Sequence, residues 1–262
     1  MNQKLTTSLL VSSVLLLTSA SLPDDHWITE KHSGYDVVYT SADRDQIKDY
    51  VRIVDNGMMS VTSFFNAPFS TGFEVYVHPN RSSLDSTWQK EWGMPEFKSE
   101  CWMVASGIAN KMAMISPVRW DKESCEHKYS EMENTQRLIT HELAHVFHGQ
   151  KNVSKDFSDI EGLDWFVEGL AVYVSGQLDK QRLSEVKNAI TSNEIPAGLD
   201  QFWSGKIRYG LSGSVVMYID RKYGRESLDA LLSLNKKSQL LSVLNVSEAE
   251  LLSDWRKYVG GL

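Results

Sequence analysis

Short apolar runs in the first half of the chain predict strands, with one long helix between two of them. Apolar side chains recur at spacings of three and four over residues 43–65, which is the period of an amphipathic helix. The run Phe73–His78 ends at the turn pair Pro79-Asn80 and predicts a strand. Two more runs predict strands at 37–40 and 111–116. The segment 81–104 predicts a helix and loops. Its tryptophans, Trp88, Trp92 and Trp102, are expected in the core, as are Trp165 and Phe166; a cage around a substrate is the alternative.

Beyond residue 130 the apolar spacing becomes helical and stays helical. Ser130 and Glu133 form a capping-box pattern, and Gly149 is placed to end the helix that they open. Ser247 and Glu250 repeat the pattern before the last helix. Strands early and helices late predict an α+β fold, with an N-terminal α/β lobe at about 21–150 and a C-terminal helical lobe at about 151–262. The predicted helices cover 130–148, 164–175, 180–191, 211–223, 226–234 and 247–259.

Residues 1–20 have the pattern of a signal peptide. Lys4 precedes an apolar stretch at 9–17, and Thr18-Ser19-Ala20 offers small residues suited to cleavage after Ala20. The stretch is about half the roughly 20 residues that a spanning helix needs, which disfavours an uncleaved anchor. We therefore expect a secreted or periplasmic protein with no stable membrane insertion after leader cleavage.

Export also bears on the two cysteines, Cys101 and Cys125. An exported chain folds in an oxidising compartment, and two cysteines allow one pairing, so we expect a disulfide. The closed loop would contribute about 3–4 kcal/mol in the chain-entropy model. Two buried free thiols are the alternative.

Composition limits the partners without naming an activity. The 262 residues are 42% hydrophobic and 23% charged, which fits a globular protein with a core of its own. Acidic residues exceed basic ones, 34 against 27, for a formal net charge of −7. Because phosphate neutralisation needs a basic face, this balance argues against a nucleic-acid partner and against an anionic membrane surface. The sequence leaves the oligomeric state open.

The chemistry is concentrated in His141-Glu142-Leu143-Ala144-His145. Two histidines four residues apart lie on the same helix face, so both imidazoles can bind one metal ion. Glu142 is turned toward the side where a water on that metal would lie. The alternative is a pair of histidines that face solvent or are satisfied in the core.

Zinc needs a third protein ligand while one position stays open to water. His148 lies one turn beyond His145, but at that spacing it should continue along the helix face. Downstream, Asp164 has the position of an N-cap, whereas Glu168 lies inside the predicted helix among apolar residues. A carboxylate in that setting needs a partner, and a metal ion supplies one.

His141-Glu-Leu-Ala-His145 followed by Trp165-Phe-Val-Glu168-Gly-Leu-Ala171 resembles the peptidase MA-like metallohydrolases, in the gluzincin group with thermolysin and the aminopeptidase-N-like enzymes. The resemblance extends from about residue 70 to the C-terminus. It implies a thermolysin-like zincin architecture for residues 21–262, with Glu168 as the third ligand and one Zn²⁺ per chain. The spacing usual in aminopeptidase-N-like enzymes falls on Asp164 instead.

The resemblance extends to three further segments. Tyr209 is similar to the tyrosine that hydrogen-bonds the oxyanion in aminopeptidase-N-like enzymes; packing on the second lobe is the alternative. The strand 111–116 is similar to the sheet edge that pairs with a peptide substrate. Residues 107–110 lack the glutamate that binds a substrate amino terminus in those enzymes, which favours an endopeptidase. His127 and Arg208 are weaker candidates for oxyanion support and are expected at the surface.

The prediction is thus an exported zinc metallopeptidase acting on peptide or protein substrates. Zinc lowers the pKa of a bound water to about 7. Glu142 would take the water proton and pass it to the leaving amine, with Tyr209 as the second catalytic residue. One alternative is a non-catalytic, zinc-stabilised extracytoplasmic binding protein, and another is a zinc hydrolase of non-peptide amides. Glu142 favours an enzyme, because a structural zinc site needs no base beside an open position.

Overall fold

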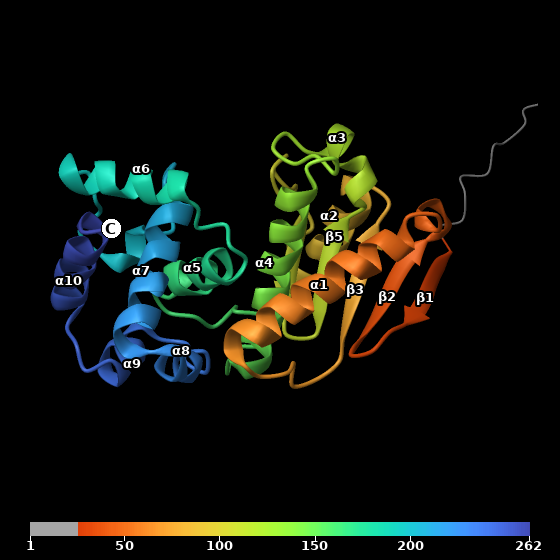
Figure 1. Ribbon diagram of the computed structural model, residues 1–262. Coiled ribbons are helices and arrows are strands. Elements are labelled where there is room, and N and C mark those ends of the chain that lie inside the picture. Colours follow the sequence, from red (N-terminus) through yellow and green to blue (C-terminus); the bar gives the residue numbers. More distant parts are fainter. Residues whose placement is uncertain (1–25) are drawn as a thin grey trace, which may run out of the picture.

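The computed structural model describes residues 26–262, so the predicted leader at 1–20 lies outside the described part. The fold is α+β, with the strands early and the helices late, as the sequence predicts (Figure 1). The strands are β1 (Trp27–Lys31), β2 (Tyr35–Thr40), β3 (Phe73–His78), β4 (Ala105–Ile108) and β5 (Lys111–Ile115). The helices are α1 (Ile47–Phe65), α2 (Arg81–Trp92), α3 (Trp120–Glu123), α4 (Met132–Lys151), α5 (Asp164–Val174), α6 (Lys180–Thr191), α7 (Arg208–Tyr223), α8 (Arg225–Leu231), α9 (Lys237–Val243) and α10 (Glu248–Gly260).

Two parts stand side by side in Figure 1: the sheet part, from β1 to α4, and the helical part, from α5 to α10. Three short 3-10 turns complete the elements, at Ser41–Asp43, Pro117–Arg119 and Leu199–Gln201. Among residues 26–262, none of the helices combines the length and the apolar character that crossing a bilayer requires.

The five-stranded sheet is mixed, with the order β1-β2-β3-β5-β4. β2, β3 and β5 are parallel, while β1 and β4 join antiparallel at the two sides. The prediction that 111–116 forms the sheet edge is therefore wrong, because β5 lies between β3 and β4. The edge next to α4 is β4, which the apolar pattern did not reveal.

Helices cover both faces of the sheet. α1 and α4 pack together on one face, where a Cβ on Gly57 would lie 2.6 Å from the Leu143 side chain. On the other face, α2 packs against β3 and β5 (Figure 1). The Trp88 indole donates a hydrogen bond to Ser106 on β4. Trp88 is 1% exposed, so its predicted place in the core is confirmed.

The helix α4 differs at both ends from its prediction. It begins at Met132, and no side chain caps it; Glu133 instead accepts a hydrogen bond from Arg137 one turn later. Gly149 does not end the helix, which continues to Lys151. That glycine lies where α4 meets the β4–β5 turn, and a Cβ on it would be 2.7 Å from the backbone nitrogen of Ala109.

The helical part is assembled around α5 and α7. These helices approach so closely that a Cβ on Gly169 would lie 2.5 Å from the carbonyl oxygen of Ser212. Asp164 is the first residue of α5 and not its N-cap, which is Leu163. The capping box of Ser247 and Glu250 at the start of α10 is confirmed.

The predicted disulfide between Cys101 and Cys125 is present, with 5.4 Å between the two Cα atoms. It joins the segment before β4 to the segment after α3. The Arg81 guanidinium reinforces this junction, since it donates hydrogen bonds to the carbonyl oxygens of Met103 and Glu123. The disulfide and Arg81 thus hold the loop between α2 and β4 against the segment that follows α3.

Candidate metal centre

The buried middle of α4 brings the two histidines together. Every residue from Leu138 to Gly149 is buried, because α1, β4 and α5 enclose the helix. His141 and His145 turn the same way, with 3.1 Å between their Nε2 atoms. Two ring nitrogens at this distance are the arrangement expected of imidazoles that share one metal ion.

Glu168, on α5, completes a cluster with these histidines. Its Oε2 lies 3.4 Å from Nε2 of His141 and 3.6 Å from Nε2 of His145. Tetrahedral zinc with ligands at about 2.0–2.2 Å holds its ligand atoms roughly 3.3–3.6 Å apart. The three atoms are therefore close enough to one another to bind a single metal ion.

The other candidates for the third ligand lie elsewhere. Asp164 is one turn earlier on α5, exposed at the cleft, and is not in the cluster. His148 is buried against Phe157 and Phe166, with its Nε2 3.4 Å from the Asn152 amide. Within residues 26–262, the single group of metal-ligating side chains with converging atoms is His141, His145 and Glu168.

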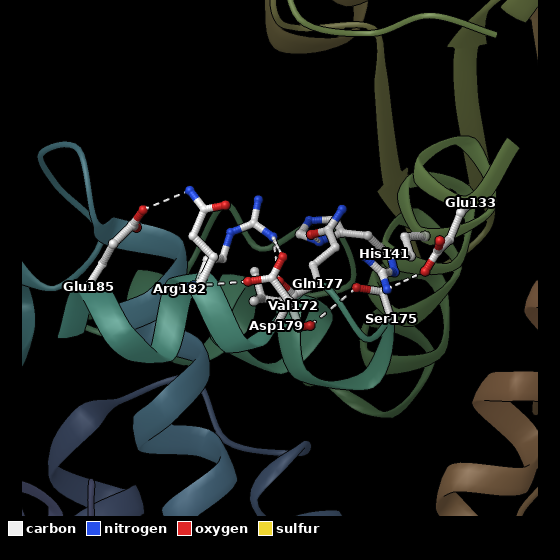
Figure 2. Close-up of polar contacts among 10 residues, drawn as sticks. Glu133, His141, Val172, Ser175, Gln177, Asp179, Arg182 and Glu185 are labelled. Atoms are coloured by element: carbon white, nitrogen blue, oxygen red, sulfur yellow. Dashed lines mark hydrogen bonds and ion pairs between the residues drawn. The ribbon is translucent and has the colours of Figure 1, made fainter. Parts of the chain in front are cut away.

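The cluster is also supported from outside. His141 Nδ1 lies 3.0 Å from the side-chain oxygen of Gln177, in the turn after α5 (Figure 2). An Nδ1–H that donates to this oxygen leaves the Nε2 lone pair free for a metal ion. Burial tends to raise the pKa of Glu168, but electrostatic attraction to the imidazoles of His145 and His141 outweighs it and holds that pKa well below its usual range. The carboxylate is thus ionised and ready to bind a cation.

Glu142 lies beside the cluster and lines the same cleft. The residue is only 8% exposed, although its carboxylate is charged when ionised. Burial raises the pKa of Glu142 to about 7; the charge of His141 opposes the shift and that of Glu168 adds to it. A carboxyl group with this pKa can both accept and return a proton near neutral pH.

The cleft over the cluster has a volume of ≈ 520 Å³, and a second hollow of ≈ 850 Å³ continues it. Tyr209, at the start of α7, lines both. Its ring lies edge-on to Trp203, with 5.0 Å between the ring centroids. Burial raises the pKa of Tyr209, so the phenol keeps its proton and can donate a hydrogen bond into the cleft.

The cleft wall contains Trp102, which was expected in the core, and His127 and Arg208, which were expected at the surface. Trp102 is half-buried and lines the cleft, and His127 lines both hollows. Arg208 lines the second hollow, with its guanidinium over the rings of Trp102 and Trp203. Trp92 is 44% exposed at the cleft rim, stacked on Trp88, so its predicted burial is wrong. The burial of Trp165 and Phe166 is confirmed.

The edge strand β4 passes directly over α4, the helix that carries His141 and His145. A Cβ on Gly107 would lie 2.2 Å from the carbonyl oxygen of Glu142 and 3.1 Å from the His145 Cβ. Only glycine permits this approach, which places the free edge of β4 along the cleft.

Sequence reasoning found His141, Glu142, His145, Glu168 and Tyr209, and the structure places all five around one cleft. It missed Gln177, which no local pattern marks, since this residue meets His141 only through the packing of α5 against α4. Compared with protein-family models and with curated proteins, the sequence matches none.

Proposed function

We propose that this chain is an exported zinc metallopeptidase of the gluzincin type, with a thermolysin-like arrangement of its sheet part, histidine helix and helical part. The observation that carries the proposal is the ligand triangle of His141, His145 and Glu168 with Glu142 beside it in one cleft. A zinc site of purely structural role is closed by four protein ligands, whereas this cluster has three and opens on a cleft.

Each residue has a definite task in this proposal. His141, His145 and Glu168 would hold Zn²⁺, which supplies Lewis acidity and makes a water molecule nucleophilic near neutral pH. Glu142 accepts the proton of the attacking water on its carboxylate and returns it to the leaving amine. Tyr209 donates a hydrogen bond from its phenol to the oxygen that becomes negative.

The edge strand favours an extended peptide as the substrate. The outer edge of β4 has no strand beside it in the described part of the chain, and β4 lines the cleft. A peptide can pair with such an edge through its backbone, so that its carbonyl groups pass over the cluster. We infer an endopeptidase, since residues 105–108 carry no carboxylate to bind a substrate amino terminus.

The test compares zinc content and hydrolysis of a denatured protein substrate in four chains. We expect Glu142→Gln to keep one equivalent of zinc and lose hydrolysis, and Glu168→Gln to lose zinc. Asp164→Asn serves as the control, because it removes a carboxylate from the same cleft and should retain both properties. Undiminished hydrolysis by Glu142→Gln would show that the general base is wrong, and zinc binding without hydrolysis in the wild type would indicate a binding protein.

A further inference from the structure

The Arg208 guanidinium lies among aromatic rings, and part of it has no hydrogen-bonding partner in the described part of the chain. Its guanidinium carbon is 5.1 Å from the ring centre of Trp102, 5.3 Å from that of Trp203 and 5.2 Å from that of Tyr209. The Nε atom is enclosed, and within residues 26–262 it has no acceptor at hydrogen-bonding distance. We call Arg208 and these three rings the arginine cage.

The other arginines of the second hollow are engaged with carboxylates. Arg137 pairs with Glu133, and Arg182 lies 3.9 Å from Asp179 and also donates to a backbone carbonyl oxygen (Figure 2). Arg208 has no ion pair with any residue of 26–262, although the neighbouring Lys206 adds to the positive charge of the same hollow.

The acidic residues near Arg208 do not form an ion pair with it. Glu185 accepts a hydrogen bond from Gln181 on its own helix, and Asp179 caps that helix by accepting from the backbone of Arg182. Glu126 lines both hollows but is exposed and makes no ion pair in the described part of the chain. Glu126 is therefore the one competing carboxylate that a test must include.

We propose that Arg208 is a specificity residue that binds a carboxylate group of the substrate. The inference rests on the proposed function, because it takes the ligand to be a peptide held in the cleft over the metal cluster. Stacking on aromatic rings keeps the N–H donors of a guanidinium in its plane, where a carboxylate binds bidentately. Tyr209 lines both hollows, so a peptide passing over it reaches the arginine cage.

Two sources supply such a carboxylate: the C-terminus of a short peptide, and an aspartate or glutamate side chain. The experiment uses the Glu142→Gln variant loaded with zinc and measures peptide binding by tryptophan fluorescence. Because this variant is not expected to hydrolyse peptides, binding is measured alone. One probe pair has a free or an amidated C-terminus. The other has Glu or Gln at one internal position, moved along the peptide. We expect one pair to show about tenfold to hundredfold tighter binding of the carboxylate form, which identifies the source.

Variants in the same background assign the effect to Arg208. Arg208→Gln should abolish the discrimination and Arg208→Lys should retain part of it, whereas Arg137→Gln, a second arginine of the hollow, should leave it unchanged. Glu126→Gln should preserve or increase it. Equal affinities for both forms in both pairs, discrimination that survives Arg208→Gln, or a loss on Glu126→Gln equal to that on Arg208→Gln would each overturn the proposal. Hydrolysis by the wild type is measured separately, so a failed peptidase assay with intact discrimination refutes the peptidase function alone.

Discussion

The hydrogen bond from His141 to Gln177 gives the sharpest prediction about the metal centre. Replacing Gln177 with Ala removes the acceptor at 3.0 Å but leaves the backbone contacts of this turn in place. The lost bond is nearly buried, because the His141 side chain is 9% exposed. A neutral hydrogen bond contributes about 0.5–1.5 kcal/mol, and loss of a partner of a ligating histidine costs about 10–100-fold in metal affinity. The two ranges overlap near tenfold, or about 1.4 kcal/mol.

A zinc titration against a chromogenic chelator measures this effect. We expect Gln177→Ala to raise the zinc dissociation constant about tenfold, and Gln177→Glu to lower it, because a carboxylate is the stronger acceptor for the Nδ1 proton. Gln181→Ala is the matched control, since Gln181 bonds only to Glu185 on an exposed helix face. A dissociation constant for Gln177→Ala equal to that of the wild type would refute the view that Gln177 orients His141.

Three further predictions concern the frame of the cleft. Gly107→Ala places a Cβ 2.2 Å from a helix carbonyl oxygen, so urea titration should show a loss of about 1–3 kcal/mol in the free energy of unfolding; an unchanged midpoint would contradict that close approach. Replacing both Cys101 and Cys125 with Ser should lower the free energy of unfolding by about 3–4 kcal/mol in the same assay. A smaller loss would mean that the unfolded chain is already compact without the disulfide. Burial raises the pKa of Asp220, but hydrogen bonds from Arg225 and a tyrosine outweigh it, so this pKa lies below its usual value. The stabilisation by ionised Asp220 is therefore present above the unfolded pKa of about 4 and lost as the pH falls through the folded pKa. Asp220→Asn should destabilise the protein at pH 7 and progressively less toward pH 2, and an equal loss at both pH values would refute the assignment.

The sequence predicted those features that depend on periodic spacing. The four-residue separation of His141 and His145 fixes their common face on any helix, and the strand Phe73–His78 was predicted residue for residue. The placement of Glu168 needed more than spacing, because it depends on how α5 packs against α4. The apolar residues around Glu168 and the family resemblance are the two sequence signals that indicate this glutamate.

The failures share a physical cause, which is tertiary packing that overrides a local signal. Gly149 reads as a helix stop, yet it serves the contact with the β4–β5 turn. β4 is four residues long and contains Gly107, so it carries no strand pattern and obtains its place from the hairpin with β5. Arg208 reads as a surface residue because the Trp102 ring, over which its guanidinium lies, is distant in sequence.

The division of the candidate metal ligands between α4 and α5 has a consequence for when the site can form during synthesis. A nascent chain that has emerged only to the end of α4 contains both histidines and Glu142, but neither Glu168 nor Gln177. Two imidazoles fall short of the three protein ligands that a catalytic zinc site requires. In a peptidase built this way, the ability to cut peptide bonds would arise only after α5 has been made and has folded against α4. The order of synthesis would therefore separate the making of the two histidines from the onset of any activity that depends on them.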